Sequence, residues 1–336
     1  MPLYENDYLC NRQGIVRFMM KLRYMIIFLV ILSFISLFIG VKNVTPLGLW
    51  HMTDDQWQIM LISRLPRLIS IIIAGVSMSV AGLIMQQLSR NKFVSPTTAG
   101  TDDAARLGIL VALMIFGAAS TMEKMLIAFV FALVGTFVFM KILDRIKFKD
   151  AIFIPLVGLM FGNVISAATT FFAYKNDLIQ NISSWLQGSF SLVLSGRYEL
   201  MYLSIPLLVV AFLYANKFTI AGMGEEFAVN LGLNHKLVVN IGLVIVALIS
   251  VVVIVTIGTI PFLGLVIPNI VTLYMGDNLK KTLSHTAVLG ATFVLVCDVF
   301  GRLIIYPYEI PIGLTVGVFG SVIFLYLLLR RRSNEA

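Results

Sequence analysis

The sequence is poor in the residues from which most catalytic and metal sites are built. It contains two cysteines, Cys10 and Cys297, and three histidines, which lie far apart along the chain. Neither set has the spacing of a disulfide framework or a metal site. The glycine-rich phosphate loop G-x-x-x-x-G-K-[ST] and the zinc motif H-E-x-x-H do not occur in the sequence. We therefore expect no catalytic residues, no bound metal and no hydrolysis of nucleotide by this chain alone.

Charged residues are also scarce. They make up 12% of the 336 residues, against 59% hydrophobic residues, whereas soluble domains are about one quarter charged. Apolar runs follow one another from Leu22 to Leu329, and each is close to the length that crosses about 30 Å of hydrocarbon as a helix. This composition predicts an all-α polytopic membrane protein without a separate soluble domain.

Charges and Gly/Pro positions divide the apolar sequence into about ten predicted transmembrane helices. They cover residues 22–40, 65–88, 101–118, 125–143, 151–174, 199–215, 237–257, 261–275, 285–300 and 312–329. The basic residues before the first run resemble a signal peptide, but the run is too long and no A-x-A-like site follows it. We expect a tail at 1–21, a transmembrane domain at 22–329 and a second tail at 330–336.

The distribution of Lys and Arg predicts the orientation. With a cytoplasmic N-terminus, seventeen of the twenty-five basic residues lie in the cytoplasmic tails and loops and seven lie in the opposite loops, with Arg106 inside a span. This satisfies the positive-inside rule with both termini in the cytoplasm. The net charge of +8 could indicate nucleic-acid binding, but these residues form short clusters between apolar runs. We assign them to membrane orientation and expect no nucleic-acid partner.

Arg64 and Arg67 do not follow this bias, because they lie at the mouth of the second predicted helix, on the outer side. They could extend to lipid headgroups, as arginines near helix ends commonly do, or they could receive a partner.

Small residues recur at helical spacing in several spans, which predicts close helix packing at Gly75, Ser79 and Gly82, Gly158 and Gly162, and Gly313, Gly317 and Gly320.

Three further segments carry unusual residues. The cytoplasmic segment at about 216–236 has Glu225 and Glu226 at a predicted helix start, and it is either a docking element or a plain connector. The stretch "GTIPFLGLVIPNI" predicts a short or broken span. Asp298 and Arg302 are spaced as a helical ion pair, and Asp102, Asp103 and Arg106 enter the third span, where ionisable groups are paired or functional.

Together these motifs resemble the ten-helix permease subunits of the binding-protein-dependent ABC importers for iron–siderophores, haem and cobalamin, the FecCD or BtuC-like family. The resemblance runs from about Arg64 to Arg330. It rests on "RLPR" followed by "SPTTAG", on "GEEFAVNLG", on "GTIPFLGLVIPNI" and on "CDVFGR" followed by "EIPIGLTVGVFG". The residues of these last motifs that carry the family pattern are Gly258, Pro261, Gly264, Pro268, Asp298, Pro311 and Gly313.

The resemblance implies roles for two groups of residues. Arg64, Arg67 and Arg302 would face outward and receive acidic residues of an extracytoplasmic binding protein. The coupling residues Gly224, Glu225, Glu226, Ala228, Leu231 and Gly232 would dock in a cytoplasmic ATPase. Asn269 stands where many members have histidine, and Asp102 and Asp103 stand where small or uncharged residues are common, so neither position indicates the substrate.

The implied protein is a bacterial plasma-membrane permease that imports a ferric siderophore by alternating access. Its partners would be a second permease subunit, identical or paralogous, two ATPase subunits that use ATP, a siderophore-binding lipoprotein and membrane lipid. The same family carries haem and cobalamin. A secondary transporter is a rival interpretation, which requires an acidic relay from Asp102, Asp103 and Asp298 and leaves "GEEFAVNLG" unexplained. An intramembrane enzyme would need paired catalytic residues that the sequence does not offer.

Overall fold

The computed structural model describes residues 21–40, 53–145, 153–191, 193–194, 196 and 198–335. Regular secondary structure in these residues is helical, apart from an isolated β-bridge between Gln187 and Thr259. The predicted N-terminal tail lies outside the described residues except for Lys21. The last helix continues through most of the segment predicted as the C-terminal tail and ends at Glu335.

Each of the ten predicted segments contains a helix. They are α2 (Leu22–Phe38), α4 (Leu65–Leu88), α5 (Thr101–Ile115), α6 (Thr121–Arg145), α7 (Phe153–Lys175), α9 (Ser204–Ala221), α11 (His235–Ile257), α12 (Leu263–Met275), α13 (Leu279–Leu303) and α14 (Ile312–Glu335). Seven helical stretches in the described residues are long and apolar enough to cross a membrane. α2 and α12 are shorter apolar helices, and α5 has 15 residues.

The second helix begins earlier than predicted. α3 (Asp54–Ile59) and a π-helical stretch, Met60–Arg64, join α4 to form one helical stretch of 35 residues from Asp54 to Leu88. Gln56 Oε1 accepts a hydrogen bond from the Thr53 N–H at 3.2 Å, and two aspartates in the first turn suit the helix dipole. Arg64 and Arg67 therefore lie within a helix and not at its mouth.

Other helix boundaries differ because buried side chains extend the elements. α9 continues to Ala221 and not to residue 215, since Phe218 and Ala221 pack inside the protein. α13 starts at the wholly buried Leu279 and not at residue 285. The sequence did not predict α8 (Ile179–Leu186) as a separate helix. The segment predicted at 216–236 therefore contains the end of α9, the short α10 (Glu225–Asn230) and the start of α11.

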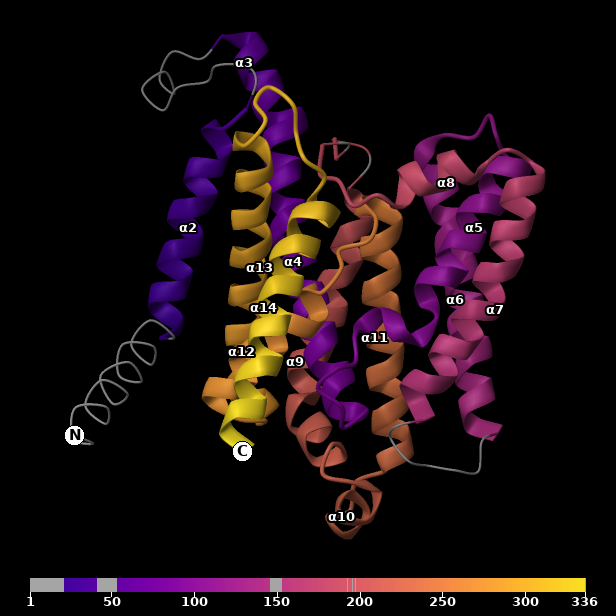
Figure 1. Ribbon diagram of the computed structural model, residues 1–336, viewed down its shortest axis with the longest axis vertical. Helices are drawn as coiled ribbons and strands as arrows, with labels where there is room; N and C mark the ends of the chain where they lie inside the picture. Colours follow the sequence, from indigo (N-terminus) through magenta and orange to yellow (C-terminus); the bar gives the residue numbers. More distant parts are fainter. Residues whose placement is uncertain are drawn as a thin grey trace.

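α4 is the central helix, and it packs against α9, α11, α12 and α13 (Figure 1). The predicted close packing of its small residues is present. A Cβ at Gly75 would come within 2.6–2.9 Å of the α13 backbone at Gly290 and Ala291, and a Cβ at Gly82 would overlap the backbone of Gly264 in α12. Without a hydrophobic drive from lipid, such close approach lets van der Waals contact hold the helices together.

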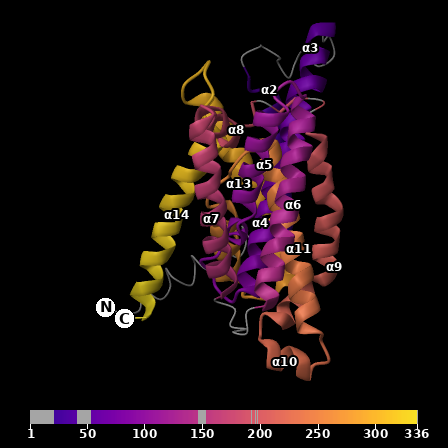
Figure 2. The same ribbon diagram turned by 90° about the vertical axis from the view of Figure 1, so that its right-hand side faces the viewer.

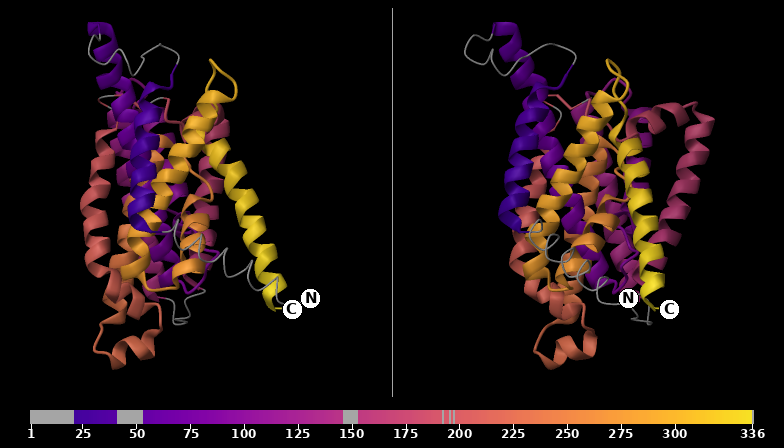
Figure 3. Two further views of the ribbon diagram at one scale, coloured as in Figure 1. Left: turned by 90° about the vertical axis from the view of Figure 1, so that its left-hand side faces the viewer. Right: turned by 60° about the vertical axis from the view of Figure 1, so that its left-hand side comes forward.

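The molecule has two distinct ends. α10 and the carboxyl end of α14 lie at one end, whereas α3, α8 and the loop between α13 and α14 lie at the other (Figures 1 and 2). The two additional views show the same arrangement (Figure 3). α5, α6, α7 and α8 form a group beside α11. These two ends carry the candidate functional residues.

Candidate functional site

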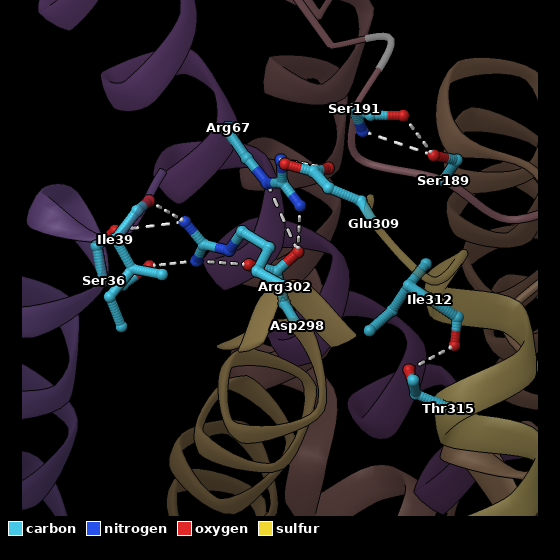
Figure 4. A network of polar contacts seen from close by, with 10 residues as sticks. All are labelled: Ser36, Ile39, Arg67, Ser189, Ser191, Asp298, Arg302, Glu309, Ile312 and Thr315. Carbon is cyan, nitrogen blue, oxygen red and sulfur yellow. Dashed lines mark hydrogen bonds and ion pairs between the residues drawn. The ribbon is translucent and has the colours of Figure 1, made fainter. Parts of the chain in front are cut away.

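A four-residue ion network, Arg67, Asp298, Arg302 and Glu309, joins α4, α13 and the loop that follows α13 (Figure 4). Arg67 donates from Nε and Nη2 to Asp298 Oδ1 at 3.3 and 2.7 Å, and from Nη1 to both carboxylate oxygens of Glu309 at 2.9 and 2.7 Å. Arg302 Nη2 lies 2.5 Å from Asp298 Oδ2, which confirms the predicted helical pair. Two arginines and two carboxylates give the network no net formal charge.

The network is largely enclosed. The side chains of Asp298 and Arg302 are 3% and 6% exposed, and that of Arg67 is 14% exposed. Glu309 is the most accessible member at 29%. In such an environment each charge depends on its partner, because removing one partner leaves an uncompensated buried charge.

Two arginines also hold the C-terminal end of α2. Arg302 Nη1 donates to the carbonyl oxygens of Ser36 and Ile39 at 3.1 and 2.9 Å, and its Nη2 donates to Ser36 Oγ at 2.5 Å. Arg64 Nη1 donates to the Leu37 carbonyl at 2.5 Å. The last carbonyls of a helix lack intrahelical partners and carry partial negative charge. The two guanidinium groups supply hydrogen bonds to these carbonyls and positive charge beside them.

The structure brings the three predicted docking arginines to one end of the molecule. It differs from the expectation in one respect: Arg302 does not face outward, because its guanidinium is turned inward between α2 and Asp298. Arg67 points toward the more accessible Glu309. Docking through these arginines stays a prediction. Sequence reasoning did not identify Glu309 as the partner of Arg67, since no spacing rule connects positions 242 residues apart.

The loop that carries Glu309 is bonded to two other segments. The Ile310 N–H donates to the Gly301 carbonyl, and the Gly313 N–H donates to the Gly188 carbonyl, both at 3.0 Å. The Thr259 N–H in turn donates to the Leu186 carbonyl at 3.0 Å. Gly258 has φ +100°, and a Cβ there would lie 2.8 Å from the Leu186 oxygen. Glycine is therefore required where these segments meet.

α12 is short, as "GTIPFLGLVIPNI" predicted. Its 13 residues span about 20 Å, which is less than the hydrocarbon thickness of a bilayer. Pro268 lies inside the helix, and Pro261 belongs to the turn before it. The Asn269 amide donates to the carbonyls of Lys92 and Leu265 at 2.7 and 2.8 Å, so this residue fastens α12 to the loop after α4.

The predicted coupling residues lie at the opposite end, around α10. Gly224 precedes the helix with φ +125°, and Gly232 follows it with φ +76°, so both turns use conformations that favour glycine. Ala228 is buried, whereas the side chains of Met223, Phe227 and Leu231 are 49–58% exposed. A hollow of about 460 Å³ beside the helix is lined by residues that include Glu225, Gly232 and His235. A projecting helix with exposed apolar side chains is a surface suited to a protein partner.

Asp102 and Asp103 of α5 do not pair with Asp298, the third residue of the acidic relay that a secondary transporter would require. The Asp103 carboxylate hydrogen-bonds the side chain of Ser166 in α7 and packs against Gly162, and Asp102 Oδ1 is enclosed by protein. Asp298 is already paired with two arginines. Among the residues that the structure describes, no group of three or more His, Cys, Asp or Glu side chains is arranged to hold a metal ion.

Comparisons with known proteins place this architecture in a family. The profile of the FecCD transport family matches residues 28–330. The chain is 66% identical over 314 residues to the petrobactin import system permease protein YclN of Bacillus subtilis, covering 94% of this chain and 99% of the relative. It is 41% identical to the ferric-anguibactin transport system permease protein FatD of Vibrio anguillarum, covering 88% and 94%.

The fold also matches a solved structure, an ABC transporter of the metal-chelate type in an inward-facing conformation. The TM-score is 0.78 with 22% identity, covering 92% of this chain and 98% of the other, which establishes similarity of fold. The match over residues 28–330 and the identity to permeases along nearly the whole chain lead to one conclusion: the chain belongs to the FecCD transport family.

Proposed function

We propose that this protein is the permease subunit of an ABC importer that carries a ferric siderophore across the bacterial plasma membrane. The observation that carries the proposal is the 66% identity, over 94% of the chain, to a petrobactin import permease. A ferric-anguibactin transport permease is a further relative, at 41% identity. Ferric petrobactin is therefore the first substrate to test, and haem or cobalamin is the alternative within the family.

We further propose ten membrane crossings with both termini in the cytoplasm. The end that carries α10 also carries Lys141 and Arg145 at the end of α6, and the opposite end carries the network of Arg67 and Arg302 (Figure 1). An excess of basic residues in the loops beside α10 is typical of a cytoplasmic side. α2, α5 and α12 would then be short crossings. Other helices of the bundle cover much of α5 and α12, whereas α2 lies at the edge and exposes most of its apolar side chains.

At the outer end, the proposed partner is a siderophore-binding protein with carboxylates on its surface. Arg64 and Arg67 would receive those carboxylates, and Arg302 would act through Asp298, which it holds against Arg67. Charge pairing of this kind favours rapid and correctly oriented encounter more than tight binding, which suits a partner that delivers cargo and leaves.

At the cytoplasmic end, α10 and its flanking glycines would dock in an ATPase subunit. Two ATPases and a second permease, identical or paralogous, would complete the importer. ATP hydrolysis would change the relative positions of the two permeases and expose the path to each side in turn. The chain itself contributes the path and the coupling, and the partner subunit hydrolyses ATP.

A deletion strain tests this proposal. We expect loss of uptake of radioactive iron from ferric petrobactin, restoration by the intact gene and unchanged cobalamin-dependent growth. Replacement of the glutamate in the Walker B motif of the partner ATPase should also stop uptake. Dissipation of the proton gradient at constant ATP should leave uptake unchanged. Uptake that follows the ion gradient instead would favour a secondary transporter, and a cobalamin defect with normal ferric petrobactin uptake would reverse the substrate assignment.

A further inference from the structure

A cavity of about 360 Å³ lies between α5, α7 and α8. α8 crosses above α5 and α7 at the end opposite α10 (Figure 1). The Trp185 indole N–H donates to the Val255 carbonyl at 3.3 Å, which anchors α8 to α11. The polar lining residues are Arg106 from α5, Thr169 and Thr170 from α7, Ser183 from α8, and Gln187 and Thr259 from the segments joined by the β-bridge.

Arg106 follows Asp102 and Asp103 in α5 and precedes an apolar stretch, and it is half-buried. In the described part of the chain its guanidinium has no hydrogen bond and no carboxylate within ion-pair distance. Asp102 and Asp103 act on it electrostatically, but neither lines the cavity, and Asp103 is bonded to Ser166. An arginine at membrane depth is costly and faces a partner or a water-filled hollow. Arg106 faces the hollow.

The other polar groups divide into two kinds. Thr169 and Thr259 donate their hydroxyl hydrogens to the carbonyls of Ile165 and Leu186, at 2.8 and 3.0 Å. The side chains of Thr170, Ser183 and Gln187 are exposed, and they make no hydrogen bond to the residues that the structure describes. The cavity therefore offers one guanidinium, one amide and two hydroxyl groups to a ligand. Guanidinium and uncharged donors together suit an anionic group with several oxygen atoms.

We propose that this cavity is a binding site for the anionic, oxygen-rich face of the iron chelate during its passage through the permease. The inference rests on the proposed function. Ferric ion bound by oxygen donors that together carry more than three negative charges forms a complex with net negative charge and exposed oxygen acceptors. The cavity volume is at the small end of ligand pockets, so it would hold part of the chelate, while the remainder contacts the other side of the path.

The site also has a favourable position. Gln187 and Thr259 border the cavity and belong to the junction that joins Leu186, Gly188 and Gly313 by backbone hydrogen bonds. An anion bound by Arg106 would therefore lie next to the segments that meet at this junction. Weak binding at this point would favour entry of the chelate without trapping it.

The first test measures the electrostatic character of the cavity and its occupation. Cys10→Ser and Cys297→Ala remove the native cysteines, and Ser183→Cys then places a single thiol in the cavity. The sample is the complete permease–ATPase complex in nanodiscs of phosphatidylcholine. We expect an anionic methanethiosulfonate to modify this thiol faster than a cationic one, and Arg106→Gln to lower the anionic-to-cationic rate ratio at least fivefold. Ferric petrobactin should slow modification at least threefold. Ser191→Cys is the matched control, because Ser191 is exposed outside the cavity lining, and its modification should be insensitive to the chelate.

The second test is uptake of ferric petrobactin by cells. Arg106→Gln should lower uptake about tenfold, and Arg106→Lys should retain a larger share because it keeps the charge. Lys124→Gln is the charge-matched control: it removes one positive charge at the start of α6, outside the cavity, and should leave uptake unchanged. The amount of assembled permease–ATPase complex shows whether each variant folds.

The outcomes separate the inference from the proposed function. If the unmodified permease imports no ferric chelate, the proposed function fails and the cavity assignment fails with it. If it imports ferric petrobactin but Arg106→Gln imports equally well, and the chelate does not protect Ser183→Cys, only the cavity assignment is overturned. Protection by added phosphatidylglycerol without any chelate would overturn it too, because the anion would then be a lipid headgroup.

Discussion

Removal of the charge of Asp298 tests the ion network most directly. Asp298→Asn keeps the size of the side chain but changes the formal charge of the network from zero to +1 and leaves Arg302, whose side chain is 6% exposed, without its carboxylate. Breaking a buried ion pair from one side costs about 3–5 kcal/mol. We expect about 3 kcal/mol, the lower end, because Arg67 keeps Glu309 and Arg302 keeps its three hydrogen bonds to Ser36 and Ile39.

The assay is reversible unfolding of the purified permease in mixed micelles with increasing sodium dodecyl sulfate. Asp298→Asn, Arg302→Met and the double variant form a double-mutant cycle. The double variant should cost about 2 kcal/mol less than the sum of the single variants, because residues in one ion network are coupled. Asp277→Asn is the matched control, because it breaks an exposed ion pair. The side chain of Asp277 is 63% exposed and that of its partner Lys92 is 31% exposed, so the change should cost less than about 1 kcal/mol.

Two results would refute this reasoning. A loss in Asp298→Asn that is no larger than that in Asp277→Asn would mean that water reaches the network and screens its charges. Additive single losses, within about 0.5 kcal/mol, would mean that Asp298 and Arg302 act independently in spite of their 2.5 Å separation.

Three further predictions concern packing, coupling and docking. Gly82→Val should lower the yield of folded permease, because its Cβ would overlap the backbone of Gly264, whereas Gly117→Val, with one contact at 3.4 Å, should not. Gly232→Val should weaken copurification of the ATPase several-fold, because φ at this position is +76°, and Gly232→Asn should have a milder effect, because asparagine tolerates this conformation. Copurification of the ATPase with both variants at the wild-type level would exclude the coupling assignment. Arg64→Glu should weaken binding-protein association in surface plasmon resonance, most at low ionic strength, while the permease–ATPase complex still assembles. Arg67→Glu should weaken association too, and it should also lower the yield of folded permease, because it places a third carboxylate beside Asp298 and Glu309. Association indifferent to both changes would return these arginines to a structural role.

The order of the helices could be predicted from the sequence because apolar run length and charge are local properties. Each of the ten predicted segments contains a helix, seven helical stretches in the described residues have membrane length, and "GTIPFLGLVIPNI" indicated the short α12 through its glycines and prolines. Errors arose where tertiary contacts determine where a helix begins or ends. The ends of α9 and α13 depend on the burial of Phe218 and Leu279, and α8 is too short to produce a span signal.

The candidate site was predictable as a set of residues but not as a set of contacts. The local pair Asp298 and Arg302 follows from helical spacing. The partners of Arg67 lie 231 and 242 residues away, and the contact between Arg302 and Ser36 spans 266 residues. No local pattern indicates whether an arginine faces a partner protein or an internal carboxylate, which is why Arg302 was expected at the surface.

The position of Glu309 gives the end of the molecule opposite α10 a specific mechanical property. Only three residues lie between it and Gly313, so its ion pair with Arg67 and the hydrogen bond from Gly313 to Gly188 are joined by a very short piece of chain. A carboxylate that displaced Glu309 from Arg67 would therefore release the loop close to the point where α14 begins. Gly188 follows Gln187, and Gln187 and Arg106 line the same cavity. If a binding protein docks as proposed, the exchange of one carboxylate for another at Arg67 would be a local electrostatic event with a direct backbone connection to the cavity where the chelate is proposed to bind.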